Sequence, residues 1–345
     1  MAITINGSGT VTGLSVGGLP DGTVDSGTLA TDSVTAVKIP DTVESSLKSG
    51  RKNLIINGGM DVWQRATSTT TAGVGYRTAD RFWTLISGGT GTFQRSTDVP
   101  AGEGFNYSMS CDATGVQYLG TSVELSATGK PGIFKANTDY TLSVWTKGTA
   151  GSMSLYFRNA IVTGTDSTTV SSLALVTSAG WTKQSVTFNM GSIVPHANNT
   201  HLGIDISNIT NGGKITGYQL EEGSVATDFE HRSYGEELAL CQRYYWKSAT
   251  GVAYSVLSSG LVYNTTEALT MVRFPTSMRV NPTMTTSGSW EVLQGSVIAG
   301  TLSFNHTNSE TTRLNLSISG GTVGRGAIVR NANDTAAYIS ADAEL

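Results

Sequence analysis

The sequence is poor in charge and in cysteine. Charged residues make up 14% of its 345 positions, against about 25% in an average soluble protein. Helical bundles and coiled coils need many Glu, Lys and Arg residues, so this composition disfavours both. The two cysteines, Cys111 and Cys241, provide neither a disulfide framework nor a zinc quartet. We expect both to be buried, inert thiols.

Long apolar runs are also missing, and the longest are only a few residues, too short to span a bilayer. The formal net charge of −4 argues against broad electrostatic capture of nucleic acid. The chain does not open with a charged segment followed by an apolar one, so we expect that it is not exported by the Sec pathway. We expect it to be made in a reducing cytoplasm. These features predict neither nucleic-acid binding nor membrane insertion.

Aromatic residues are missing from the first part of the chain, since the 6 Trp, 12 Tyr and 9 Phe residues all lie from Trp63 onward. The first fifty residues carry small, scattered aliphatic side chains such as Val11, Leu14 and Val24. They cannot bury enough apolar surface alone to offset chain entropy. Either the segment is disordered, or it is ordered against identical copies or a larger body. We predict an extended stalk over residues 1–51.

Glycine is abundant, at 41 residues, together with Ser, Thr and Asn. Between these turn-forming residues, apolar and polar side chains alternate, which is the pattern of half-buried antiparallel strands. A strand starting at Asn53 and one near Phe93 bring the predicted number to about eight, the size of a jelly roll. We therefore predict an all-β chain with a jelly-roll β-sandwich over residues 52–232. The alternating segments are 105–111, 140–145, 153–158, 186–190, 202–206 and 216–220.

A short helix and a second β-region follow. Ser233 and Glu236 form a capping box, and Leu238, Cys241 and Tyr245 then lie on one helical stripe. From position 249 the chain returns to alternating segments, beginning with a predicted strand over 252–257. We predict a linking helix and a smaller C-terminal distal β-domain over residues 233–345.

Signatures of enzymes are scarce, with no P-loop, GxGxxG, HExxH or GxSxG motif. His196 and His201 lie five apart in a predicted loop without a third ligand, so we assign no metal site. Glu221 and the next glutamate are adjacent on a strand and face opposite sides, so they are not a glycosidase pair with each other. A carboxylate such as Asp205 or Glu124 could still pair with Glu221. That pairing leaves glycan hydrolysis open.

Two groups of side chains are candidates for binding. Trp145, Tyr156 and Arg158 lie opposite the apolar stripes of their strands, where an aromatic ring can stack on a sugar, pack under a loop or meet another subunit. The block at 80–83 (DRFW) is interpreted structurally, with its aromatics in the core. In the distal domain, Trp290 follows a Gly-Ser turn and is predicted at a loop tip. The distal candidates for sugar stacking are Tyr254, Tyr263, Trp290 and Tyr338.

Several stretches resemble bacteriophage tail fibres. GSGTVTGLSVGGLPDGTV and LATDSVTAVKI resemble the amino-terminal attachment and stalk region. NLIINGGMDVWQR and YRTADRFW resemble the start of the carbohydrate-binding-module-like domain, and GYQLEEGSVATDFEHRSYGEELALCQRYYW its last strand and following helix. The closing AAYISADAEL resembles their carboxy-terminal strand. The resemblance implies a homotrimeric fibre whose amino end joins a phage tail or baseplate protein. The sandwich is similar to calcium-binding sugar modules, but no Asp cluster assigns a calcium site, so a structural calcium stays open and no cofactor is assigned.

We therefore expect a structural fibre protein of the virion tail, made in the host cytoplasm, that binds a host-surface receptor, namely a glycan. We expect no enzymatic activity, because the chain has neither a β-helix repeat nor an evident acidic pair. The alternative is a tail-borne polysaccharide depolymerase. A secreted bacterial adhesin or sugar-binding module is a third, weaker interpretation.

Overall fold

The computed structural model describes residues 4–5, 11–12, 51–125, 134–148, 151–158, 168–190, 201–209, 211–248 and 251–344. The chain divides into two units, residues 1–50 and 51–345. Of the first unit, the description covers only the antiparallel pair β1 (Thr4–Ile5) and β2 (Val11–Thr12). The predicted stalk thus lies almost entirely outside the described residues, and the boundaries at 51/52 and 232/233 stay predictions.

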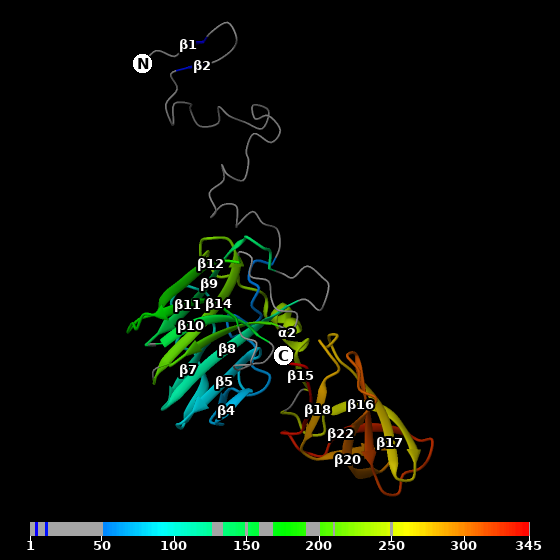
Figure 1. Cartoon of the computed structure of the whole chain (residues 1–345). Helices are drawn as coiled ribbons and strands as arrows, with labels where there is room; N and C mark the ends of the chain where they lie inside the picture. Colours follow the sequence, from blue (N-terminus) through cyan, green and yellow to red (C-terminus); the bar gives the residue numbers. More distant parts are fainter. Residues whose placement is uncertain are drawn as a thin grey trace. The chain divides into compact units, whose positions relative to one another are not determined.

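The described chain is almost all β, as predicted, and its larger part is a sandwich of two antiparallel six-stranded sheets (Figure 1). The first sheet contains β4 (Gly73–Tyr76), β5 (Phe82–Ser87), β8 (Val116–Glu124), β10 (Gly151–Arg158), β11 (Thr168–Leu175) and β13 (His201–Ser207). Its strand order is β11-β10-β13-β8-β5-β4. The second contains β3 (Ser68–Thr69), β6 (Gly91–Ser96), β7 (Ser108–Ala113), β9 (Asp139–Lys147), β12 (Thr182–Asn189) and β14 (Gly213–Glu222). Its order is β12-β9-β14-β7-β6-β3.

The core of the sandwich lies between the two sheets. Leu142 and Leu220 from the second sheet pack in one cluster with Leu155 and Ile204 from the first. These are the apolar positions of the alternating segments, so alternation located these strands correctly. It missed β8, because side chains on both faces of this strand are buried. Those of Leu119 and Thr121 point to one face, and Gly120 and Ser122 lie on the other. A strand buried on both faces has no alternating pattern to detect.

The predicted strand at Asn53 is wrong. Residues 55–59 form a bend and a turn, and Asn57 and Met60 have positive φ angles of 60° and 55°. The Asn57 carboxamide donates to the carbonyls of Val62 (2.9 Å) and Asp80 (2.8 Å), which holds the turn in place. A Cβ on Gly58 would lie 2.1 Å from the Tyr218 carbonyl oxygen. The apolar side chains here are thus buried by close backbone packing and not by strand pairing.

The helix α2 (Tyr234–Gln242) begins at the predicted N-cap, where Ser233 Oγ accepts from the backbone N of Glu236 at 3.3 Å. It ends before Tyr245, which lies in β15 (Tyr245–Lys247), so the predicted stripe is one turn too long. Cys241 and Cys111 are buried free thiols, as expected, and burial raises the pKa of both. Among the described residues, no helix is long and apolar enough to cross a membrane.

The C-terminal β-region contains a closed six-stranded barrel. Its strands are β16 (Val256–Asn264), β17 (Glu267–Arg273), β19 (Trp290–Leu293), β20 (Val297–Asn305), β21 (Thr311–Ser317) and β22 (Gly326–Asn331), in the order β16-β17-β21-β20-β19-β22. The first strand starts later than predicted, after Tyr254, whose positive φ of 57° interrupts extended backbone. β18 (Thr283–Ser287) and β23 (Tyr338–Asp342) form a separate sheet with β15, in the order β15-β23-β18.

A cluster of charges joins the end of the chain to the sandwich. We call Arg65, Arg81, Asp80, Asp342 and Glu344 the C-terminal charge cluster. Arg65 pairs with Asp342 at 2.8 Å and with Glu344 at 3.3 Å, and Arg81 pairs with Glu344. The interpretation of the 80–83 block is confirmed in that Phe82 and Trp83, the first residues of β5, are buried. The charged half of the block holds the carboxy-terminal segment.

Candidate functional site

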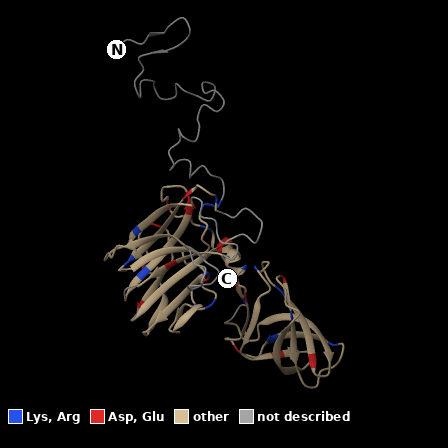
Figure 2. Ribbon diagram, in the orientation of Figure 1, with Lys and Arg blue, Asp and Glu red and all other residues tan. Residues whose placement is uncertain are grey.

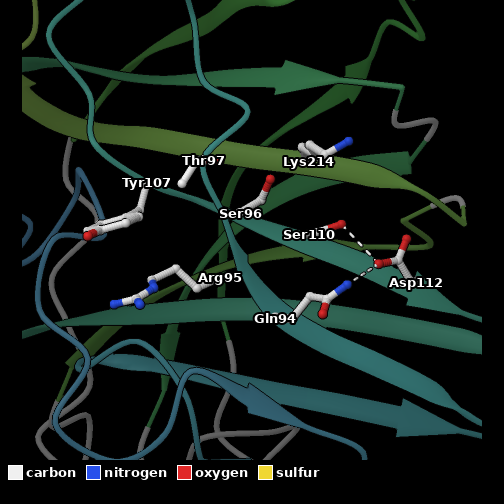
Figure 3. A pocket seen from close by; sticks show the side chains of 8 residues that line it. All are labelled: Gln94, Arg95, Ser96, Thr97, Tyr107, Ser110, Asp112 and Lys214. Atoms are coloured by element: carbon white, nitrogen blue, oxygen red, sulfur yellow. Dashed lines mark hydrogen bonds between the residues drawn. The ribbon is translucent and has the colours of Figure 1, made fainter.

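Charged residues are sparse over the strands (Figure 2), and several of them gather at one groove of the sandwich. This sandwich groove has a volume of about 660 Å³ and lies along β6, β7 and β14 of the second sheet (Figure 3). Its lining residues are Gln94, Arg95, Ser96, Thr97, Tyr107, Ser110, Asp112 and Lys214.

Strand register decides which of these side chains share a face. Ser110 of β7 pairs with Gln94 of β6 on one side and with Lys214 of β14 on the other. The neighbours of opposite parity, Met109 and Cys111, are buried in the core. Because side chains alternate along a strand, the row formed by Gln94, Ser110 and Lys214 lies on the outer face of the sheet.

The carboxylate of Asp112 is held by two donors from this row. Its Oδ2 accepts from Gln94 Nε2 at 2.8 Å and from Ser110 Oγ at 3.1 Å, as Figure 3 shows. Asp112 is only half-buried, so its other oxygen stays able to accept from a ligand hydroxyl.

The ammonium group of Lys214 is paired with Asp98, which lies just after β6. Asp98 Oδ2 is 3.2 Å from Lys214 Nζ and 2.8 Å from Lys147 Nζ. Its Oδ1 accepts from Trp181 Nε1 at 3.0 Å. The hydrogen bond from Lys147, supported by those from Trp181 and Lys214, lowers the pKa of Asp98 to about 2. Asp98 is thus an anion that fixes two lysines at the border of the groove.

Arg95 and Tyr107 also line the groove, but Arg95 pairs with the buried Met109 in register, so its side chain has the parity opposite to that of Gln94 and Ser110. The Arg95 guanidinium lies 4.5 Å from the centroid of the Tyr107 ring, a cation–π distance. Arg95 is exposed. Its backbone N donates to Thr67, but within the part of the chain that the structure describes its guanidinium makes no hydrogen bond or ion pair. The outer face of the groove therefore presents hydroxyls, an amide, an anion and an ammonium group, while the Arg95 guanidinium and the Tyr107 ring belong to the opposite parity.

The predicted sandwich residues do not form one site. Trp145 lies on β9 and Tyr156 on β10, so they belong to different sheets and face away from the shared core on opposite sides. Trp145 is half-buried beside a bulge of β14 at Gly217, where an added Cβ would lie 2.8 Å from its ring and 2.7 Å from Phe105. Arg158 pairs with His201 in register, but its side chain is outside the described part.

The loop-tip position predicted for Trp290 is wrong. Trp290 is the first residue of β19, is 5% exposed and belongs to the core of the barrel. Its Nε1 donates to Thr286 Oγ1 at 2.9 Å. The backbone does bend at Gly288, but the strand after it points the indole inward. A ring buried in this way offers no face to a sugar.

The distal tyrosines are accessible but separate. Tyr263 on β16 is 59% exposed, and Tyr254, before that strand, is 48% exposed with its ring centroid 4.8 Å from the Arg330 guanidinium. Tyr338 opens β23 and lies 4.1 Å from Lys247 Nζ. A second groove on the barrel, of about 480 Å³, contains none of them. It is lined by Ser259, Gly260, Leu293, Gln294, Gly295, Gly326, Ala327 and Ile328.

The histidines and carboxylates considered as metal ligands or catalytic acids do not form such sites among the described residues. His201 is not in a loop but opens β13 and is buried, while His196 lies outside the described residues. Nowhere in the described ranges do three or more His, Cys, Asp or Glu side chains gather so as to hold a metal ion. Glu221 is buried on β14 and accepts from Thr227 N (2.9 Å) and Thr227 Oγ1 (2.6 Å). Asp205 and Glu124 belong to the other sheet.

Sequence reasoning missed the sandwich groove altogether. Its lining comes from positions 94 to 214, and nothing in the sequence says that β6, β7 and β14 are neighbours. The polar residues that alternate with Met109 and Cys111 indicated that one face of β7 is exposed to solvent. The identity of the strands beside it is a matter of topology.

Comparisons with known proteins gave only distant likenesses. No family model matches the chain, and no curated protein matches it. Among solved structures, tailspike protein 4 of bacteriophage CBA120 (enzymatically active domain) matches at 12% identity and a TM-score of 0.32, over 50% of this chain and 21% of that chain. A cyclase from Fischerella sp. TAU matches at 15% and 0.35, over 52% of this chain and 100% of that chain.

The CBM22-1 xylan-binding domain of Paenibacillus barcinonensis Xyn10C matches at 14% identity and a TM-score of 0.28, over 52% of this chain and 100% of that chain. Structures that resemble part of this chain thus include a phage tailspike domain and a carbohydrate-binding domain. At these identities and TM-scores, the matches carry no argument about what this chain binds.

Proposed function

We propose that this chain is a structural fibre protein of a bacteriophage tail that binds a glycan on the host surface. The observation that carries the proposal is the sandwich groove, where hydroxyls, an amide and charged groups lie on the outer face of the sheet and the aromatic residue Tyr107 also lines the hollow. Sugars are recognised by this combination, because rings pack on the apolar faces of pyranoses and short polar groups bond their hydroxyls. The resemblance of the quoted sequence stretches to tail fibres supports the phage context.

The proposal includes a division of labour along the chain. Residues 1–51 attach the fibre to a tail or baseplate protein, and the remainder contacts the host. Three copies assemble on one axis, which gives the aromatic-free segment a partner for its aliphatic side chains. Weak single sites, at about millimolar affinity, then gain avidity of about 10²–10⁴ through several copies.

Binding of purified full-length protein to host cells and to a glycan array tests the function. Tyr107→Ala with Gln94→Ala should abolish binding, because it removes the aromatic ring and an amide of the sandwich groove. The comparison variant, Tyr254→Ala with Tyr263→Ala, should bind as the parent does. Both rings are exposed on the distal domain and neither lines the sandwich groove. The opposite result would place the receptor site on the distal domain, and no glycan binding by any form would contradict the function.

Three further measurements test the rest of the proposal. Light scattering should give three times the mass of one chain, and a monomer at micromolar concentration would contradict the trimer. Incubation with bound host polysaccharide should release no oligosaccharide, whereas release would favour the depolymerase. Deleting residues 1–51 should preserve cell binding and remove assembly onto the tail, and loss of cell binding by a folded trimer would contradict the division of labour.

A further inference from the structure

Exposed apolar side chains gather on the C-terminal β-region. Of the fifteen large apolar side chains that are exposed among the described residues, ten lie between positions 252 and 328. Single exposed apolar residues are common on protein surfaces, but several on one surface mark a contact with another molecule. Strand register decides which of these ten share a surface.

Strand β17 presents one row of side chains to the outside of the barrel. Ala268 and Val272 belong to the barrel core, so the residues of the other parity point outward. On the neighbouring strand β16, Leu261 is 48% exposed and pairs with Leu269 in register, which widens the apolar middle of the row. We call the outward row of β17 together with Leu261 the barrel face. The outward row consists of Glu267, Leu269, Met271 and Arg273.

The two ends of the barrel face carry opposite charges. Arg273 is exposed, and within the described ranges its guanidinium makes no hydrogen bond or ion pair. Glu267 accepts from Asn315 Nδ2 at 2.5 Å but has no cationic partner among the described residues. The two residues are six positions apart on one strand, which separates them by about 20 Å. They are too far apart to pair with each other inside one copy.

A second copy of this chain fits the barrel face in shape and in charge. The barrel is closed, so a partner cannot add a strand and meets this face through side chains. Leu261, Leu269 and Met271 carry no polar group that could bind the hydroxyls of a sugar. The Glu267 end of another copy is complementary to the Arg273 end of the first, with apolar side chains between the two charges.

We infer that three copies of this chain meet at the barrel face, with Arg273 of each copy paired with Glu267 of the next. This inference rests on the proposed function, which includes three copies on one axis, and names the surface at which their barrels pack. Three β17 strands then form a triangle around the axis. Sides of about 20 Å place each strand about 6 Å from the axis, close to the ~5 Å between a sheet and the midplane of a packed pair. The side chains of Leu269 and Met271 fill that space.

Site-directed cross-linking of the full-length protein tests the inference. Glu267→Cys with Arg273→Cys places one thiol at each end of the barrel face, while both native cysteines are buried. A bismaleimide too short to join the two thiols of one copy should link neighbouring copies, with a covalent trimer as the largest species on a denaturing gel. Either single variant should give at least about tenfold less linked product, because like ends do not meet in a head-to-tail ring.

Two controls separate a specific contact from random collision. Ala299→Cys with Asn305→Cys places thiols at exposed positions with the same spacing on β20, which β21 separates from β17, and should give no covalent trimer. Adding Met271→Asp to the double-cysteine protein should reduce the covalent trimer at least about tenfold, because three carboxylates would then face one axis. Met271 is 63% exposed, so the fold should persist, which circular dichroism checks.

The outcomes separate this inference from the proposed assembly. Absence of linked product from the double-cysteine variant would overturn the inference. Light scattering that still gives three times the mass of one chain would then leave the proposed trimer in place, whereas a monomer would contradict that trimer as well.

The size and specificity of the linked product test the arrangement itself. Linking that ends at a dimer would mean a two-fold contact, and a ladder beyond the trimer would mean an open fibre. Either result would overturn the three-fold contact. Equal linking of the β20 control, or a yield that Met271→Asp does not change, would also overturn it.

Discussion

The sandwich groove and the C-terminal charge cluster are built from the same kinds of residue, arginines beside tyrosines and carboxylates, yet they differ in burial. In the cluster, the side chains of Arg81 and Glu344 are 1% and 5% exposed. At the border of the groove, those of Asp98 and Lys214 are 36% and 24% exposed. Buried charges depend on their partners, whereas solvated charges can exchange one partner for another. The comparison teaches that burial, more than composition, separates a structural ion pair from a binding site.

The cluster is internally well connected. Arg81 donates to the Ser122 carbonyl at 2.9 Å, and its guanidinium lies 3.6 Å from the Tyr244 ring centroid. Arg65 stacks on Tyr245 at the same distance. Burial disfavours the charged form of Arg81, but the interactions with Glu344, Tyr76, Tyr244 and Cys241 together outweigh it, so the pKa of Arg81 is raised. Arg65 and Arg81 are thus charged, and their guanidinium groups make contacts that stabilise the fold.

The largest decrease in stability is expected when a buried charge loses its partner. Arg81→Met should lower the free energy of unfolding by about 3–5 kcal/mol, because Glu344 stays buried with only Arg65 to compensate it. Urea denaturation followed by fluorescence measures the change. Arg51→Met is the matched control, because it breaks an exposed pair with Glu236 and should cost less than about 1 kcal/mol. Equal losses in the two variants would show that burial does not distinguish the pairs.

The next effect is a dependence on pH from Asp80. Burial raises the pKa of its carboxyl to about 7, although hydrogen bonds from Gln64 and the charge of Arg65 lower it. The folded protein therefore binds the extra proton more tightly than the unfolded chain, whose carboxyl has its ordinary value of 3.8. The stability from this proton is fully present below about pH 4 and is lost as the pH rises through about 7.

Asp80→Asn should remove this dependence. The free energy of unfolding of the parent should fall as the pH rises from 4 to 7. In the variant, this fall should be smaller by about 2–4 kcal/mol. Denaturation midpoints across that range measure the difference. Parallel curves for the two proteins would mean that the carboxyl is ionised throughout.

Asp98 should behave in the opposite direction and more weakly. Its pKa is lowered to about 2, so its contribution is present above about pH 4 and is lost as the pH falls through 2. Because the pairs are partly exposed, Asp98→Asn should cost at most about 1 kcal/mol at neutral pH. The difference from the parent should vanish near pH 2 in acid titration of the fluorescence signal, and a difference that grows in acid would contradict it.

The smallest effect on stability is expected at Arg95. Arg95→Gln should change the free energy of unfolding by no more than about 0.5 kcal/mol, because the side chain is exposed and unpaired within the described structure. Thermal unfolding of both proteins provides the check. A large loss of stability would assign Arg95 to the fold and remove the basis of the comparison.

Much of the fold could be predicted from local patterns. Alternation located β9, β10 and β13, and the capping box placed the start of α2 at Ser233. The strand predicted at Asn53 failed because the pattern cannot register how closely Gly58 approaches Tyr218. Trp290 failed for a related reason, since a turn before a strand does not say which way the first side chain of that strand points.

The sequence by itself determined the all-β class, because short alternating segments separated by Gly, Ser, Thr and Asn can bury their apolar faces only in sheets. It also indicated that both cysteines are buried, and the structure confirms this. Only the tertiary structure decided which polar residues meet. Gln94, Ser110 and Lys214 share a row because β6, β7 and β14 are neighbours, and Glu344 reaches Arg81 across most of the chain. Such contacts depend on strand order and long-range closure, which local periodicity does not encode.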